Sequence, residues 1–285
     1  MKYILINLLL SVWVINSNIN LIRGQVVDNV VDRVGGAVDS LLGGDDNDVC
    51  GMPYEGASAE GLDPVLVRYP WISKLLNRGF LACALTKVSE NAYVTAASCV
   101  HRINKTNLIV QSGIFDPNNV QSQLVEDRVN EIIEHPEYRP QTHENDLAVL
   151  KTYGSTSFNP VCIPEGNTEQ YVDVRATVIS FGNGQNSPAE EISVKPISTT
   201  DCKLNTKYDP QDIFFTMLCA PYNAEDKDAC QGVPNGSPLH FLDDGRETII
   251  GITSPIGSPC EDTGYPQVFT RITNYVEFIE ANINN

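Results

Sequence analysis

The residues of this chain that could do chemistry lie in three short stretches of sequence. Ser98 follows two alanines in YVTAASCVHR, Asp146 precedes the apolar run of ENDLAVLK, and Ser237 lies near the end of CQGVPNGSPL. A hydroxyl beside an imidazole base and an orienting carboxylate can hydrolyse esters and amides through a covalent intermediate. Of the four histidines, His101 and His143 lie close in sequence to Ser98 and Asp146. One hypothesis is therefore a hydrolytic site in which one of these histidines serves Ser237.

The two histidines are nevertheless better interpreted as surface residues. A serine hydroxyl cannot accept a proton near neutral pH, whereas an imidazole can because its pKa lies near 6.5. His101 lies three residues beyond Ser98, and His143 lies three residues before Asp146. Ser237 directly precedes Pro-Leu and is expected to lie deep in a strand. A hydrolytic site built from these groups is therefore the remote interpretation.

The N-terminal residues have the layout of a secretory signal peptide. Lys2 is followed by the apolar run 3–15, and small and polar residues between Ser17 and Gly24 offer a cleavage site, so residues 1–24 are assigned to the signal. The apolar run is short for a membrane span, and a retained anchor is the less favoured alternative. The sequence predicts a secreted, extracellular protein without membrane insertion.

The charge and the cysteines narrow the possible partners. The chain carries 19 basic and 36 acidic residues, a formal net charge of −17 at pH 7. Such acidity disfavours nucleic acid, heparin-like polymers and anionic membranes. Eight cysteines in a secreted chain indicate four disulfides, and the CxxC spacing of a zinc site does not occur. We expect protein partners, no metal and no cofactor.

Two regions follow the signal peptide. Residues 25–61 form an acidic leader in which apolar residues recur at helical spacing until Gly35-Gly36 interrupts them. A mobile leader is favoured there over a partner-binding amphipathic helix. Residues 62–285 contain short runs rich in branched residues, such as FLACALT, NLIVQSGIF and ETIIGIT, which predict an all-β domain. The final TNYVEFIEANI is the exception, because its apolar spacing predicts a docked helix.

Seven stretches, taken in order, resemble the chymotrypsin-like (trypsin-fold) serine protease family. They are YPWISKLL, YVTAASCV, EHPEY, ENDLAVLK, PVCIP, DACQG and GYPQVFTRITNYVEFI. The resemblance covers residues 50–285 and implies two six-stranded antiparallel β-barrels with a C-terminal α-helix. It also implies four disulfides, which would join the pairs Cys50–Cys162, Cys83–Cys99, Cys202–Cys219 and Cys230–Cys260.

The chain departs from this family at the catalytic positions. Ser98 takes the place of the imidazole in the family's TAAHC segment. Pro234 falls where the nucleophilic serine of C-x-G-D-S-G-G-P-L should be, and proline has neither a hydroxyl nor a backbone N–H. Asp146 matches the orienting carboxylate and is expected to accept hydrogen bonds, for example from Ser98, as a buried structural group. The resemblance therefore predicts a degenerate triad and no protease activity.

Activation and substrate selection are altered as well. Residues 34–67 contain no lysine or arginine for the family's activating cleavage, and Val233 replaces the aspartate that would receive the new N-terminus. Asp228 matches the carboxylate that selects basic substrates in trypsin-like members. Ile256 and Gln267 replace two glycines of that pocket and are expected to fill it. Gln267 is also a candidate hydrogen-bond partner for Asp228.

Two sequons for N-glycosylation occur, at Asn104 and at Asn235. A glycan on Asn235 would cover the cleft of a protease fold. Because Pro238 follows the second sequon directly, Asn104 is the better candidate for modification.

These departures resemble the non-catalytic serine protease homologues of arthropods, the masquerade-like and clip-domain group. CGMPYEG before YPW is similar to the junction between linker and barrel in that group, but only Cys50 precedes the barrels, so the clip domain has no counterpart here. The resemblance implies a haemolymph or venom protein that acts as a binding cofactor or decoy in an immune protease cascade, notably prophenoloxidase activation for melanisation. Its expected partner is an active serine protease, a protease zymogen or prophenoloxidase. Direct binding of microbial surfaces or host receptors is the alternative function.

Overall fold

The computed structural model describes seven segments of the chain. They are residues 50–53, 63–114, 123–165, 171–181, 189–222, 233–256 and 264–283. All of them belong to one compact unit, Val49–Asn285. The predicted signal peptide 1–24 and most of the leader 25–61 lie outside the described residues, and so do Asp228, Cys230 and Cys260.

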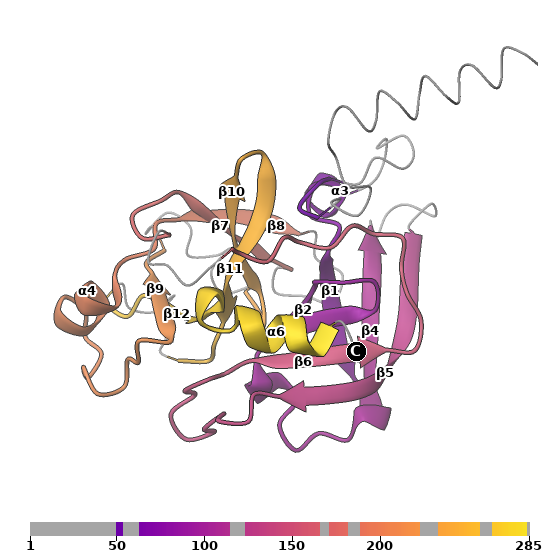
Figure 1. Cartoon of the computed structure of the whole chain (residues 1–285), viewed down its shortest axis with the longest axis horizontal. Coiled ribbons are helices and arrows are strands. Elements are labelled where there is room, and N and C mark those ends of the chain that lie inside the picture. The colour runs from indigo at the N-terminus through magenta and orange to yellow at the C-terminus, as the bar shows by residue number, and fades with distance from the viewer. Residues whose placement is uncertain are drawn as a thin grey trace, which may run out of the picture. The chain divides into compact units, whose positions relative to one another are not determined.

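The first half of this unit folds into a closed β-barrel with the strand order β1-β2-β3-β6-β5-β4 (Figure 1). Neighbouring strands pair antiparallel around the whole barrel. The strands are β1 (Ile72–Asn77), β2 (Phe80–Lys87), β3 (Ala92–Thr95), β4 (Leu108–Ile114), β5 (Gln123–Glu134) and β6 (Ala148–Thr152). Two of the apolar runs that the sequence assigned to strands, FLACALT and NLIVQSGIF, supply β2 and β4.

The second half forms a six-stranded antiparallel sheet with the order β8-β7-β10-β11-β12-β9. Its strands are β7 (Ala176–Ser180), β8 (Glu190–Val194), β9 (Met217–Ala220), β10 (Pro238–Asp243), β11 (Arg246–Thr253) and β12 (Gln267–Arg271). A single bridge between Ile197 and Cys219 brings the two edges of this sheet together, so it is a half-barrel rather than a closed one. The predicted all-β architecture of two six-stranded antiparallel units is confirmed.

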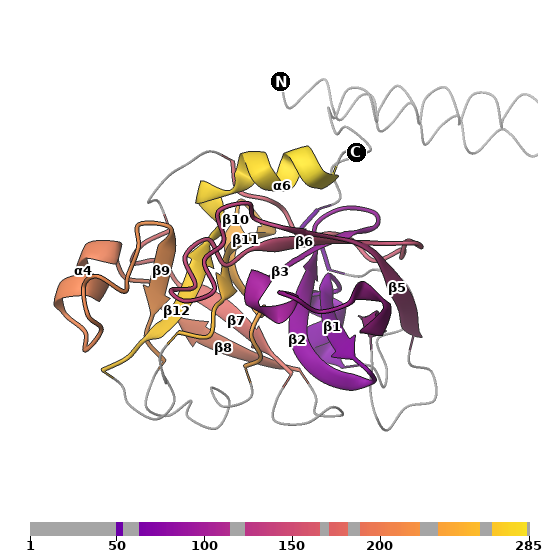
Figure 2. The same cartoon turned by 90° about the horizontal axis from the view of Figure 1, so that it is seen from below.

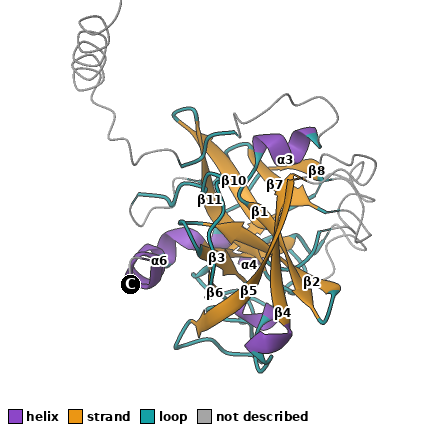
Figure 3. Ribbon diagram, turned by 90° about the vertical axis from the view of Figure 1, so that its right-hand side faces the viewer, coloured by secondary structure: helices purple, strands orange, loops and turns teal. Residues whose placement is uncertain are grey.

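The α-helices are short and lie at the margins of the sheets (Figure 3). Helix α3 (Pro64–Arg68) begins at Asp63, whose carboxylate accepts from two N–H groups of the first turn. Helix α4 (Thr199–Leu204) begins after Ser198, whose hydroxyl accepts from the Asp201 N–H. The C-terminal helix α6 (Val276–Ile283) lies beside β6, as Figure 2 shows, and buries Ile279 completely. The predicted C-terminal helix is therefore present.

A large apolar core fills the first barrel and extends to α6. Trp71, Leu75, Leu85 and Leu150 are among its fully buried side chains. Burying such a side chain stabilises the fold by about 1.5–3 kcal/mol. Among the described residues, no helix is long and apolar enough to cross a bilayer.

Three of the four expected disulfides lie within the described residues, and all three are formed. They join Cys50 to Cys162, Cys83 to Cys99, and Cys202 to Cys219. The first ties the segment before the barrels to the start of the second half of the chain. The expected pair of Cys230 and Cys260 lies outside the described residues.

Candidate functional site

The centre of the site is the carboxylate of Asp146, which lies just before β6 and is fully buried. Its Oδ1 accepts a hydrogen bond from the Ser98 backbone N–H at 2.7 Å, and its Oδ2 accepts from the Ser98 hydroxyl at 3.0 Å. The Ser254 hydroxyl donates to the same Oδ2 at 2.7 Å. Burial raises the pKa of Asp146, and these three hydrogen bonds act against that rise. The hydrogen bond that the sequence suggested between Ser98 and Asp146 is thus part of a larger set.

A short turn after β3 places Ser98 next to the carboxylate of Asp146. Residues Ala97–Cys99 form a 3-10 helix in which Ala97 and Cys99 are buried. The Cys83–Cys99 disulfide fixes the end of this turn to β2. Because both of its neighbours point into the core, Ser98 faces the other way, toward Asp146.

Asp146 also joins the two halves of the domain. Ser98 belongs to the first barrel, whereas Ser254 follows β11 of the second sheet. The Thr270 hydroxyl of β12 donates to the main-chain oxygen of Asp146 at 2.8 Å. Sequence reasoning missed Ser254 and Thr270, because neither carries a signal that distinguishes it from other hydroxyl residues of strands.

The two candidate histidines are partly exposed, with 29% of the His101 side chain and 28% of the His143 side chain accessible to solvent. His143 is brought back toward the site by left-handed backbone at His143 and Asn145, and its Nδ1 lies 3.8 Å from Asp146 Oδ2. That distance permits charge attraction when the ring is protonated but exceeds a hydrogen bond. His101 pairs instead with Glu134, with 2.8 Å between Nδ1 and Oε2.

Ser237 lies directly before β10 rather than within the strand, but it is buried as expected. It is fully buried, and its main-chain oxygen accepts from the N–H and the hydroxyl of Thr253. Its own hydroxyl is buried without a hydrogen-bond partner. Since a substrate must reach the attacking oxygen, Ser237 is not placed as a nucleophile.

The segment before Ser237 is anchored to the first barrel. The main-chain oxygen of Asn235 accepts from the Ala84 N–H at 2.9 Å, next to the Cys83–Cys99 disulfide. Gly236 has φ +83°, and a Cβ on it would collide with the Ala84 oxygen. Counting from Cys230 places Pro234 at the serine of S-G-G-P-L, whereas counting back from Pro-Leu places Asn235 there. Neither side chain carries a hydroxyl.

Gln267, which the resemblance assigns to the specificity pocket, is buried. This side chain is 7% exposed, and its Nε2 donates to the main-chain oxygens of Ser254 and Val268, both at 2.9 Å. Asp228 lies outside the described residues, so its pairing with Gln267 stays a prediction. Ile256 packs with the cluster around the Cys202–Cys219 disulfide.

Other predicted site residues have structural surroundings of their own. Val233 packs against the apolar cluster of the second sheet, and its match to the aspartate of the family stays a prediction. Asn104 is exposed, and its Oδ1 accepts from the N–H and the hydroxyl of Thr106. Asn235 is half-buried beside the fully buried Ser237. Glycosylation at both sequons stays a prediction, with Asn104 the more accessible.

One buried histidine was not singled out by the sequence. His240 in β10 is fully buried, and its Nε2 accepts from the Trp71 indole N–H at 2.8 Å. Its ring stacks on Tyr69 with centroids 5.3 Å apart. Desolvation lowers the pKa of His240 to about 3, so the imidazole is neutral at physiological pH. Within the described residues, no group of three or more histidine, cysteine, aspartate or glutamate side chains is arranged to hold a metal ion.

The closed barrel, the half-barrel and the carboxylate at their junction define the chymotrypsin-like class of β-proteins. The family model described as Trypsin matches residues 61–279, and the chain belongs to this family.

Several family members are similar over most of this chain. Trypsin-1 of Astacus astacus is 30% identical over 236 residues, which cover 78% of this chain and 98% of that protein. Serine proteinase stubble of Drosophila melanogaster is 31% identical over 262 residues, or 82% of this chain. Serine protease 56 of Mus musculus is 30% identical over 230 residues, or 76% of this chain. The matched regions make up only 32% of stubble and 37% of Serine protease 56.

Proposed function

We propose that this chain is a secreted, catalytically inactive serine protease homologue that acts by binding other proteins. The observation that carries the proposal is the set of donors on Asp146. The three groups that hydrogen-bond its carboxylate are the Ser98 N–H, the Ser98 hydroxyl and the Ser254 hydroxyl. None of them can take a proton from a nucleophile near neutral pH.

The nucleophile loop supports the same proposal. The serine position holds either Pro234, which has no hydroxyl, or Asn235, whose amide nitrogen has a delocalised lone pair and is not a nucleophile. Loss of the base or of the nucleophile alone lowers turnover by about six orders of magnitude in a related triad. Since both groups are replaced here, a cleft that holds ligands without cleaving them is the function that fits the residues.

The proposed role is that of a cofactor or decoy in an extracellular immune protease cascade, with prophenoloxidase activation as the leading case. Its support is the resemblance to arthropod protease homologues together with the acidity of the chain. A net charge of −17 favours docking onto basic loops, such as those of an active protease, a zymogen or prophenoloxidase. Binding would alter the activity of the partner without cutting it.

A second candidate, a hydrolase with a rebuilt site, rests on His143. Its imidazole Nδ1 lies 3.8 Å from the Asp146 carboxylate and could approach it by a small rotation. The candidate still needs an accessible hydroxyl, and the buried position of Ser237 does not supply one. Direct binding of microbial surfaces or host receptors remains the other binding function to be tested.

The first test measures whether the chain hydrolyses esters or amides. Purified full chain, Ser98→Ala and His143→Gln are each treated with a fluorophosphonate probe and with ester and amide substrates at millimolar concentration. The proposal expects no labelling and no turnover above buffer for all three. Labelling of the unmodified chain that His143→Gln abolishes would overturn it in favour of the hydrolase, because a contaminating protease would survive in the variant.

The role is tested in plasma. Arthropod plasma is incubated with and without the folded chain, and the rate of phenoloxidase product formation is measured. Reduced and alkylated chain, which has the same sequence but is unfolded, is the control for an effect of charge alone. A change that only the folded chain produces supports the cofactor or decoy role. Retention of the chain on microbial polysaccharide, with no effect on the cascade, would favour the direct binder instead.

A further inference from the structure

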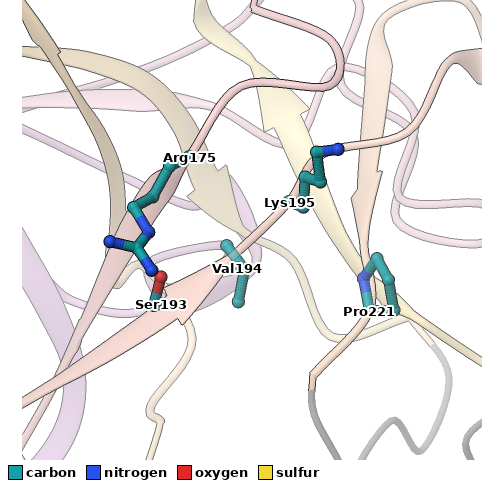
Figure 4. A pocket seen from close by; sticks show the side chains of 5 residues that line it. All are labelled: Arg175, Ser193, Val194, Lys195 and Pro221. Carbon is teal, nitrogen blue, oxygen red and sulfur yellow. The ribbon is translucent and has the colours of Figure 1, made fainter.

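A pocket on the second sheet lies outside the cleft. It has a volume of about 250 Å³ and is lined by Arg175, Ser193, Val194, Lys195 and Pro221. Figure 4 shows Arg175 and Ser193 on one side of the pocket and Lys195 and Pro221 on the other. These residues come from the start of β7, the end of β8 and the segment after β9. The described residues of these elements donate no hydrogen bond to Asp146.

The strand register brings the polar residues of this pocket to the same face. Ala176 pairs with Val194 and Thr177 pairs with Ser193. Side chains alternate between the two faces of a strand, so the residues before and after this buried pair, Arg175 and Lys195, point outward as neighbours. Ala176 and Val194 point inward to the core of the sheet. The arrangement is therefore set by the backbone and does not depend on one rotamer.

Two like charges placed opposite each other on a sheet repel unless an anion lies between them. Lys195 pairs with Asp173 at 2.6 Å, but both side chains are exposed, so this pair contributes little and can rearrange. Arg175 is exposed, and no described carboxylate pairs with its guanidinium.

We propose that this pocket binds a tetrahedral oxyanion, namely the sulfate or phosphate group of a small monoester. A guanidinium presents two parallel N–H donors to two oxygens of such a group, and the Lys195 ammonium and the Ser193 hydroxyl can reach a third. A planar carboxylate has only two oxygens and leaves one of these donors without a partner. The ring of Pro221 offers an apolar surface against which the ester carbon skeleton packs.

The size and charge of the surroundings restrict the ligand further. A volume of about 250 Å³ accommodates an anionic head with a single sugar ring. The acidity of the whole chain repels polyanions at long range, whereas a single anion within a Debye length of two cations is attracted. The site is separate from the cleft, so it stands whether or not the chain regulates a protease cascade.

The test is calorimetric titration of the full chain at low salt with glucose 6-phosphate and glucose 6-sulfate. Inorganic phosphate and sulfate form a second arm, and glucose is the neutral control. We expect binding of the esters that Arg175→Ala weakens by about tenfold or more, the size of one hydrogen-bonded charge. Arg128→Ala removes an exposed arginine of β5 and is the matched control, which should leave binding unchanged. Both variants are on the surface and should melt within a few degrees of the unmodified chain.

Each possible outcome either supports or contradicts the proposed oxyanion site. Ester binding that is lost in Arg175→Ala and kept in Arg128→Ala supports the proposal. Equal affinity for the inorganic ions also supports the oxyanion site but identifies the free ion as the ligand. Absence of binding at about 10 mM ester, or an equal effect of the two variants, would overturn it.

Discussion

Replacement of His240 by phenylalanine should remove a specific part of the acid sensitivity of this fold. In the folded chain His240 is fully buried, and desolvation lowers the pKa of its imidazole from 6.5 to about 3. In the unfolded chain the imidazole is hydrated and titrates near 6.5. Between these two values the unfolded state binds a proton that the folded state does not. The free energy of unfolding therefore falls as the pH falls from about 6.5 toward 3.

The magnitude follows from the two pKa values. Each pH unit in this window costs about 1.4 kcal/mol, so about 2 kcal/mol of stability is lost between neutral pH and about pH 5. Phenylalanine keeps the stacking on Tyr69 but removes the acceptor of the Trp71 N–H. The variant should be less stable by about 1–3 kcal/mol at neutral pH, because that buried donor loses its partner. This deficit should shrink by about 2 kcal/mol at about pH 5.

Urea unfolding followed by tryptophan fluorescence measures this difference. The chain has two tryptophans; Trp71 is fully buried in the first barrel, and the other, Trp13, lies in the predicted signal peptide. Contributions of other groups, such as the raised pKa values of Asp146 and Glu247, are common to both proteins and cancel in the comparison. If the unmodified chain and His240→Phe lose stability in parallel between neutral pH and about pH 5, the reasoning about His240 is wrong.

Three further substitutions test individual contacts of the fold and of the site by urea unfolding at neutral pH. Gly236→Ala should destabilise by about 2–4 kcal/mol, because its backbone is left-handed and a Cβ would collide with the Ala84 oxygen; a change below about 1 kcal/mol would contradict this packing. Asp63→Ala should cost about 1–3 kcal/mol, because its carboxylate both caps α3 and accepts from the Ala189 N–H, whereas Asp63→Asn should retain part of the cap. Ser254→Ala should cost about 1.5–3 kcal/mol by removing one donor from the buried carboxylate of the cleft, and Ser254→Thr should restore most of it.

The fold could be predicted from the sequence because its signals are local and repeated in order. Branched residues in short runs specify strands, and the segments of YPW, TAASC and NDLAVLK then fix which family arrangement the strands adopt. Three of the expected disulfides are also confirmed, because the family arrangement determines which cysteines along the chain lie close together. These features depend on spacing along the chain, which the sequence contains directly.

The site was harder to predict where spacing changes or where contacts cross the two halves. The nucleophile loop carries one extra residue, so counting from Cys230 and counting from Pro238 give different residues at the serine position, Pro234 and Asn235. The approach of His143 to Asp146 depends on two left-handed residues. Left-handed backbone at non-glycine residues is uncommon, so a sequence pattern gives little warning of it.

The main-chain partners of Gln267 could not be predicted from the sequence. Its Nε2 donates to the main-chain oxygens of Ser254 and Val268. Buried main-chain groups need hydrogen-bond partners as much as side chains do, and their positions are known only once the strands are placed.

The buried carboxylate of Asp146 has a structural role that does not require catalysis. A buried carboxylate is costly unless its oxygens are satisfied, and here Ser98 supplies two donors from one barrel while Ser254 supplies one from the other sheet. The main-chain oxygen of Asp146 is bound by Thr270 of the second sheet as well. The carboxylate therefore connects the two halves of the domain, and a substitution that removed it would leave several buried donors without an acceptor. The proposed exchange of the family's imidazole for the hydroxyl of Ser98 preserves that connection, so the fold does not depend on the imidazole for its stability.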